Sequence, residues 1–166
     1  MIAKAASTRR TRVRSGVNEL KPYKFLLDRD VSKAASLFPV RRTRTVADVG
    51  LPENATDAAV VEKAWDLEAI IVTANGDDFL RETRTFLRST KRRDCHDLFG
   101  LVILPNKFEI QKRTLDELGL RLRFRNNRIS WDEVWRQNLC VRVKKKGNPE
   151  VTQLPRCFYC QKAGAS

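Results

Sequence analysis

The segment Ala69-Ile70-Ile71-Val72 is a continuous run of apolar residues, and it restricts the fold more than any other stretch of the chain. A strand that is apolar at every position is typically buried on both faces, as in the centre of a parallel sheet. Residues 24–27 and 99–105 have the same largely apolar character. Parallel strands need crossover connections, which are usually helices. The chain is therefore expected to be an α/β protein.

The segments between these runs have helical periodicity. Val31, Ala34, Ala35 and Phe38 recur at helical spacing, and Pro39 ends that pattern. The expected elements are strands at residues 24–27, 41–48, 69–72 and 99–105 and helices at residues 31–38, 56–68 and 80–90, with a polar turn at residues 73–79. This β-α-β-α-β-α-β order predicts right-handed crossovers and a three-layer α/β/α sandwich with a central, mostly parallel sheet.

The remainder of the chain is less regular. Residues 110–118 are expected to form a helix, and residues 120–125 alternate apolar residues with Arg, which is typical of a half-exposed strand. Trp131 and Trp135 share one face of a short helix, and like Trp65 they are expected to pack rather than to stack on bases. The predicted organisation is a basic arm at residues 1–22, a folded domain at residues 23–125 and an extension at residues 126–166 that holds a basic run and a Cys-x-x-Cys tail.

The chain has 33 Lys and Arg residues against 20 Asp and Glu residues, which gives a formal net charge of +13. Such a surface attracts polyanions, and nucleic acid is the commonest one. The alternative is a generally basic protein whose charge serves solubility. The arm at residues 1–22 has too few large apolar residues to bury its own surface, and it is either a phosphate-contacting arm or an inert tail.

The sequence also indicates a compartment. No run approaches the roughly 20 apolar residues of a membrane span, so no membrane association is expected. Residues 1–14 lack the apolar core of a secretory signal, although their acid-free composition also matches a transit peptide. Four cysteines without a regular framework indicate a reducing environment. We therefore expect a cytoplasmic protein.

Acidic residues stand at the junctions of three expected elements. Asp28 and Asp30 follow the first strand, Asp57 opens the second helix, and Asp77 and Asp78 follow the third strand. Ligands of open α/β sheets bind outside the carboxyl ends of the strands, so these carboxylates are expected to converge there. Asp is also among the best N-cap residues, and Asp30 is expected to cap the first helix.

Converging carboxylates repel one another, and burying them unpaired is costly. A hard divalent cation removes this conflict, because Mg²⁺ is bound by one or two carboxylates together with waters and substrate phosphates. We expect Mg²⁺ or Mn²⁺ at this edge, with Asp28, Asp57, Asp77 and Asp78 as ligands. A metal cleft within a basic surface suits phosphodiester hydrolysis, because the metal lowers the pKa of a bound water.

Three short motifs carry a resemblance to a known family. They are Leu26-Leu27-Asp28-Arg29-Asp30-Val31, Asp48-Val49-Gly50-Leu51-Pro52 up to Asp57, and residues 70–79 (IIVTANGDDF). In this order they resemble the PIN-like proteins of the DUF5615 type, which are related to the Mut7-C and VapC-like nucleases. The resemblance spans residues 24–105 and implies a PIN-like domain with a metal-dependent ribonuclease site. It assigns catalytic roles to Asp28, Asp57 and Asp78.

The chain departs from the family pattern in two loops. Asn75 stands where the family usually has Asp, and Gly76 lengthens that loop by one residue, so Asp77 is a candidate replacement ligand. Arg29 stands beside the first catalytic Asp in place of an acid, and Asp30 follows it. Both departures bear on activity more than on the fold.

Further residues are expected to support the site. Thr73 is expected to orient a carboxylate or a phosphate through its hydroxyl, unless it is only a β-branched strand end. Asp30 and Asn75 are the other supporting candidates. The expected nucleic-acid contacts are Arg29, Lys91, Arg92, Arg93, Arg121, Arg123 and Arg125. The alternative for these cations is a solvated charged face.

Cys157 and Cys160, with Cys95 and His96, have the ligand types of a zinc site. A structural zinc site more often has two close pairs, and adjacent Cys95 and His96 fit tetrahedral geometry poorly. We therefore expect ordinary thiols here in preference to zinc or to a redox pair.

The sequence thus predicts a metal-dependent endoribonuclease that acts on RNA. The resemblance alone adds a toxin role with a small antitoxin protein as partner, and a homodimer is one of the assemblies left open. One alternative is a catalytically inactive PIN-like RNA-binding protein that lost its metal through Asn75 and Arg29. The other is an interaction module whose acids cap helices.

Overall fold

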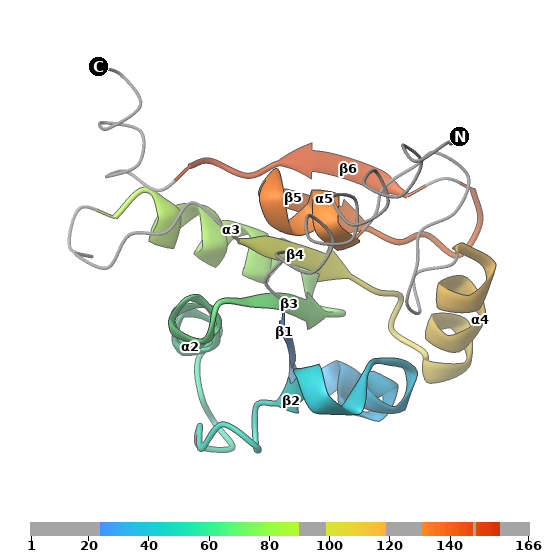
Figure 1. Cartoon of the computed structure of the whole chain (residues 1–166), viewed down its shortest axis with the longest axis horizontal. Helices are drawn as coiled ribbons and strands as arrows, with labels where there is room; N and C mark the ends of the chain where they lie inside the picture. Colours follow the sequence, from blue (N-terminus) through green and yellow to red (C-terminus); the bar gives the residue numbers. More distant parts are fainter. Residues whose placement is uncertain (1–23, 90–98, 119–130, 148, 157–166) are drawn as a thin grey trace, which may run out of the picture.

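The sheet at the centre of the protein has six strands. A computed structural model describes residues 24–89, 99–118, 131–147 and 149–156. The strands lie in the order β2-β1-β3-β4-β5-β6 (Figure 1). Their bounds are Lys24–Leu27 for β1, Thr43–Thr45 for β2, Ala69–Thr73 for β3, Gly100–Ile103 for β4, Leu139–Arg142 for β5 and Glu150–Gln153 for β6. Neighbouring strands are parallel except at the edge, where β6 pairs antiparallel with β5.

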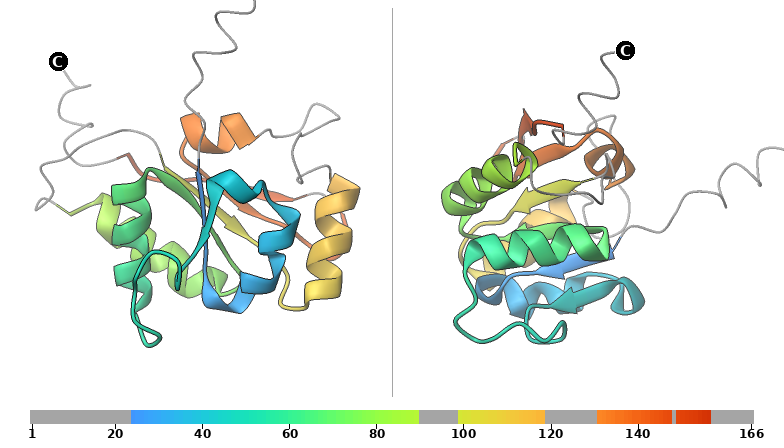
Figure 2. Two further views of the ribbon diagram at one scale, coloured as in Figure 1. Left: turned by 60° about the horizontal axis from the view of Figure 1, so that its bottom comes forward. Right: turned by 90° about the vertical axis from the view of Figure 1, so that its left-hand side faces the viewer.

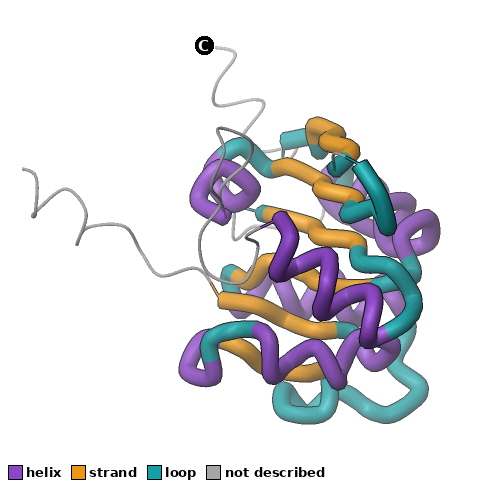
Figure 3. The backbone as a smooth tube through the Cα atoms, turned by 90° about the vertical axis from the view of Figure 1, so that its right-hand side faces the viewer, coloured by secondary structure: helices purple, strands orange, loops and turns teal. Residues whose placement is uncertain are grey.

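Helices cover both faces of this sheet. They are the 3₁₀ helices η1 (Arg29–Leu37) and η2 (Val40–Arg42) and the α-helices α2 (Asp57–Leu67), α3 (Gly76–Leu87), α4 (Phe108–Leu118) and α5 (Trp131–Arg136). Buried side chains of η1, α4 and α5 pack on one face, and those of α2 and α3 pack on the other. In Figure 2 (left) the green helices α2 and α3 lie on one side of the strands and the gold helix α4 on the other, and Figure 3 shows α4 in front of the stacked strands. This arrangement confirms the predicted three-layer α/β/α fold with a mostly parallel sheet.

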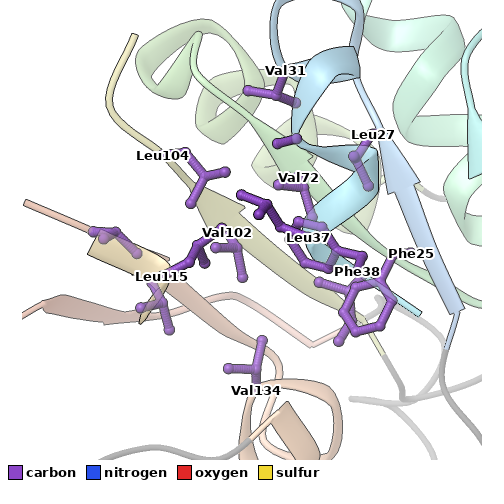
Figure 4. Close-up of a cluster of buried hydrophobic side chains, with 14 of the residues drawn as sticks. Phe25, Leu27, Val31, Leu37, Phe38, Val72, Val102, Leu104, Leu115 and Val134 are labelled. Atoms are coloured by element: carbon purple, nitrogen blue, oxygen red, sulfur yellow. The ribbon is translucent and has the colours of Figure 1, made fainter. Parts of the chain in front are cut away.

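The strands contribute to both cores because successive side chains of a strand point to opposite faces. Phe25 and Leu27 of β1 join the cluster that contains Val31 and Leu37 of η1 (Figure 4). Leu26, which lies between them, is fully buried in the cluster under α2 and α3. Every residue of β3 and β4 is buried. The continuous apolar runs therefore predicted the central strands correctly.

The first helix is a 3₁₀ helix. Its buried residues Val31, Ala34 and Leu37 are three apart, which matches the three residues per turn of this helix type. The sequence pattern placed a helix here correctly, but the apolar positions it used (Val31, Ala34, Ala35 and Phe38) have the spacing of an α-helix.

Two expected boundaries are wrong. The strand expected at residues 41–48 is reduced to β2, because the Asp48 carboxylate accepts the Thr45 N–H at 2.8 Å and turns the chain there. The expected turn at residues 73–79 contains the start of α3, since the Phe79 N–H donates to the Asn75 carbonyl at 3.2 Å. Asp77 and Asp78 therefore lie in the first turn of α3, where carboxylates interact favourably with the helix dipole.

The sheet continues beyond residue 125. Cys140 of β5 pairs with Leu101 of β4, and Thr152 of β6 pairs with Cys140. Residues 139–153, which the sequence indicated as part of an extension, thus belong to the sheet. The segments at residues 91–93 and 120–125, the basic arm and the cysteine tail lie outside the described residues. In the described part of the chain, no helix is long and apolar enough to cross a membrane.

The strand order creates a topological switch point between β1 and β3. From β1 the chain moves outward to β2 and then returns to the other side of β1 to form β3. In open α/β sheets, ligands bind at such a point, outside the carboxyl ends of the strands. Asp28 directly follows β1 and Thr73 ends β3. Both residues therefore lie where this fold class places its ligands.

Candidate functional site

Asp28 and Thr73 form the centre of the candidate site. The Asp28 N–H donates to the Val72 carbonyl at 2.9 Å, which continues the pairing of β1 with β3 by one residue. The Thr73 hydroxyl, which is fully buried, donates to Oδ2 of Asp28 at 3.1 Å. The same hydroxyl oxygen accepts the Asn75 N–H at 3.0 Å. Thr73 therefore orients the Asp28 carboxylate, as the sequence predicted.

Asp30 reaches across to the end of β3. Both of its carboxylate oxygens lie within 3.2–3.3 Å of the Ala74 N–H, which donates to them. Removal from water, together with repulsion from the neighbouring Asp28 carboxylate, raises the pKa of Asp30 to about 6. The sequence predicted that Asp30 caps the first helix. That prediction is wrong, because the Asp30 side chain accepts a hydrogen bond from Ala74, which follows β3 and is 44 residues away in the chain.

Asp57 is the third carboxylate of the site. It is the first residue of α2, whose N-cap is Thr56, and the Thr56 side chain accepts the Ala59 N–H at 3.2 Å. The Asn75 side-chain amide donates to Oδ2 of Asp57 at 3.4 Å. Partial burial raises the pKa of Asp57, and repulsion from Asp28, Asp78 and Glu82 raises it further, against a smaller opposing effect of Arg81. Asp57 therefore sits in a predominantly negative environment.

The side chains of Asp77 and Asp78 have different partners although the two residues are adjacent in α3. Asp78 faces Asp57 and pairs with Arg81 at 2.9 Å. Asp77 has a side chain that is 93 % exposed and pairs with Arg142 of β5 at 2.9 Å. The structure thus brings Asp28, Asp30, Asp57 and Asp78 to one edge with Thr73 and Asn75. It turns Asp77 toward β5.

Helix capping does not explain the first three acids. Asp28 occupies the N-cap position of η1 but makes no side-chain capping hydrogen bond. Asp30 accepts from Ala74, and Thr56 rather than Asp57 caps α2. The capping alternative is therefore wrong for Asp28, Asp30 and Asp57.

Arg29 does not fill the site. Its guanidinium donates to the Pro52 carbonyl at 3.2 Å. It lines a pocket of about 490 Å³ together with Ser32, Leu51 and Glu53. Arg29, which stands between Asp28 and Asp30 in the sequence, is thus engaged with the loop that precedes α2.

Two residues near the site were not identified from the sequence. Glu82 lies four residues after Asp78 in α3 and raises the pKa of Asp57. Its helical spacing from Asp78 was a usable signal, because residues four apart share a helix face. Arg142, the partner of Asp77, is 65 residues away in sequence. No local pattern could have found it.

The other predicted residues divide into two groups. Trp65 is buried and packs against Phe86 and Phe99 at ring-centroid distances of 5.4 Å and 6.0 Å, and Trp135 is also buried. The packing role predicted for these two is confirmed. The remaining predicted contacts and cysteine ligands lie outside the described residues: Lys91, Arg92, Arg93, Arg121, Arg123, Arg125, Cys95, His96, Cys157 and Cys160.

The carboxylates suit one kind of metal site and not another. Within the described ranges, no group of three or more His, Cys, Asp or Glu side chains is arranged to hold a metal ion. A closed cage made by the protein alone is therefore not formed there. Mg²⁺, however, is commonly bound by one or two carboxylates, with waters and substrate phosphates as the other ligands. Asp28 and Asp57, which repel each other, have the oxygen donors for such an open site.

Comparison of the chain with protein-family models, curated proteins and solved structures gave no significant match.

The raised pKa of Asp30 predicts a pH-dependent stability. Between 3.8, its ordinary value, and about 6, the folded protein binds more protons at Asp30 than the unfolded chain does. Stability therefore falls as pH rises through this window. We expect Asp30→Asn to raise the midpoint of thermal unfolding above pH 6 and to leave it unchanged below 3.8, measured by circular dichroism with chelator present.

Asp48→Asn is a control for which the expected change in stability has the opposite sign. Hydrogen bonds from Thr45 lower the pKa of Asp48, so its charge stabilises the folded state at neutral pH. This variant should be less stable than the parent protein there. Equal midpoints for Asp30→Asn and the parent protein above pH 6 would contradict the account of Asp30.

Proposed function

We propose that the protein is a metal-dependent endoribonuclease that hydrolyses RNA phosphodiesters. The observation that carries the proposal is the convergence of Asp28 and Asp57 at the β1/β3 switch point. Each carboxylate is oriented by a neighbouring side chain, Asp28 by Thr73 and Asp57 by Asn75. The family resemblance over residues 24–105 supports the same proposal.

The residues have separate roles in this proposal. Asp28 and Asp57 would hold Mg²⁺ or Mn²⁺, with Asp78 close to Asp57. A bound divalent ion polarises the scissile phosphate and lowers the pKa of a bound water. Thr73 keeps Oδ2 of Asp28 in place, and the Asn75 amide does the same for Oδ2 of Asp57. No histidine is required at the site, which suits a chain with a single His.

The charge of the protein supports a polyanionic substrate. The chain carries a formal net charge of +13 although its candidate site is acidic. A basic surface raises the local concentration of nucleic acid and speeds its association. The ribonuclease resemblance makes RNA the substrate that we propose, rather than DNA.

A second candidate function is RNA binding without cleavage. Two observations favour it: Asn75 replaces an acid of the family pattern, and Asp77 and Asp78 are both paired with arginines. In this alternative the basic surface still binds RNA, but Asp28 and Asp57 do not hold a metal. The toxin role, the antitoxin partner, the homodimer and the cytoplasmic location remain predictions from the sequence.

The two functions differ in a direct assay. The full chain is incubated with end-labelled single-stranded RNA and Mn²⁺, with and without excess EDTA. We expect internal cleavage only with Mn²⁺, and products that lack a 2′,3′-cyclic phosphate, because water rather than the 2′-hydroxyl attacks. Salt-sensitive RNA binding without cleavage would establish the second function. Cyclic-phosphate products formed in EDTA would contradict the proposed mechanism.

A further inference from the structure

We infer that a basic pocket beside the acidic site binds a backbone phosphate of the RNA strand, an inference that rests on the proposed function. The pocket has a volume of about 370 Å³ and lies at the carboxyl ends of β4 and β5. Its basic lining residues are Lys107, Arg142, Lys144 and Lys145. Neither Asp nor Glu occurs among the described residues that line it. A cavity with this charge selects an anion.

The pocket adjoins the carboxylates of the candidate site. Ala74 lines the pocket, and its N–H donates to Asp30. Arg142 also lines the pocket, and its guanidinium donates to Asp77 in the first turn of α3. The parallel strands β3, β4 and β5 end at the same edge of the sheet. The pocket therefore lies at the same edge of the sheet as Asp28 and Asp57, and we place the RNA strand along this edge.

Arg142 is held in place over the start of α3. A Cβ atom at Gly76 would lie 2.9 Å from Nη1 of Arg142 and 2.8 Å from Cγ2 of Ile103. The guanidinium thus lies against the backbone of Gly76, in the space where a larger residue would carry its Cβ. Gly76 is the residue that lengthens this loop relative to the family pattern. The missing side chain of Gly76 leaves room for the Arg142 guanidinium next to its contact with Asp77.

A guanidinium held in this way is suited to a phosphate. Its planar fork has five N–H donors and recognises phosphate oxygens in a fixed geometry. The Asp77 contact orients Arg142 through one nitrogen, and the arginine side chain remains 36 % exposed. Arg142 therefore lies beside the pocket with further N–H donors that can reach a phosphate.

The lysines add charge at the rim of the pocket. Lys107, Lys144 and Lys145 are exposed. Lys144 pairs with Glu150 at 3.5 Å, and both side chains of this pair are at least half exposed. Such exposed pairs are weak, so a phosphate can replace Glu150 as the partner of Lys144. These lysines contact the strand as point charges and carry no base specificity.

The test compares two variants that lose the same charge. Lys144→Ala/Lys145→Ala removes two pocket lysines, and Lys24→Ala/Lys33→Ala removes one exposed lysine from β1 and one from η1, neither of which lines the pocket. The affinity of each full-length variant for a fluorescent single-stranded RNA is measured by anisotropy in EDTA over a range of salt concentrations. On a single strand, each phosphate contact contributes about 0.7 to the slope in a plot of log affinity against log salt. We expect the pocket variant to lose about 1.4 from this slope for its two lysines and the control variant to keep the slope of the parent protein.

The outcomes separate the pocket from the proposed function. If the two double variants have equal slopes and affinities and the parent protein cleaves RNA with Mn²⁺, the phosphate pocket is overturned and the nuclease function is not. If the parent protein does not cleave RNA but the pocket variant still has a lower slope, the nuclease function is overturned and the phosphate pocket is supported. Binding of inorganic phosphate is measured by ³¹P NMR. If the pocket variant loses phosphate binding but keeps RNA binding, the pocket is a free-phosphate site and the inference is overturned.

Discussion

Asp28→Asn is expected to reduce Mn²⁺-dependent RNA cleavage at least about 100-fold, because even partners of metal ligands cost 10–100-fold when they are removed. The substitution removes the negative charge that would bind the metal. It keeps the shape of the side chain and an oxygen that still accepts the Thr73 hydroxyl. The folded structure should therefore be retained, and the loss should appear in the cleavage rate.

The matched control for Asp28→Asn is Glu109→Gln. Glu109 is an exposed residue in the first turn of α4, which packs on the other face of the sheet from α2 and α3. It undergoes the same change from carboxylate to carboxamide and should leave cleavage unchanged. RNA binding in EDTA should be equal in both variants. Full cleavage by Asp28→Asn, or an equal loss in both variants, would exclude Asp28 as a ligand.

Phe79→Ala is expected to have the largest effect on stability. Phe79 is fully buried in the cluster under α2 and α3, which also contains Leu26 and Leu101. Truncating a buried Phe removes apolar burial and leaves a cavity, which costs about 3–5 kcal/mol of unfolding free energy. Many domains have a total stability of only about 5–15 kcal/mol. The variant should therefore be severely destabilised in urea unfolding.

Phe86→Ala is the matched control for Phe79→Ala. Phe86 lies two turns further along α3 and is only partly buried, against Trp65. Its truncation removes less buried surface, so it should shift the urea midpoint by a smaller amount. Equal shifts for the two variants would show that the α3 core is not packed as described. Because Phe79 follows Asp78 directly in α3, its loss should also reduce metal-dependent cleavage at temperatures where the variant remains folded.

The sequence predicted the elements whose signals are local. The apolar runs of β1, β3 and β4 are recognisable because burial on both faces requires an apolar residue at every position. Thr56 was among the residues expected to begin α2, and its side chain does cap that helix. The ends of these strands placed Asp28 near Thr73 before any contact was known, because parallel strands share one carboxyl edge.

The elements that were missed depend on distant partners. In β5 the apolar residues Leu139, Cys140 and Val141 are followed by a basic run, which concealed the strand. The strand forms because these residues pair with β4, nearly 40 positions earlier. The contact between Asp77 and Arg142 depends on this pairing and on the room left by Gly76. No local periodicity contains that information.

Mn²⁺ binding by the full-length protein, followed by the electron paramagnetic resonance signal of the free ion, tests the metal site most directly. The parent protein is compared with Asp28→Asn/Asp57→Asn at neutral pH in the absence of RNA. The account predicts that the parent protein removes Mn²⁺ from solution and that the double variant removes much less. Equal uptake by the two proteins, or none by the parent protein, would contradict a metal site built from Asp28 and Asp57.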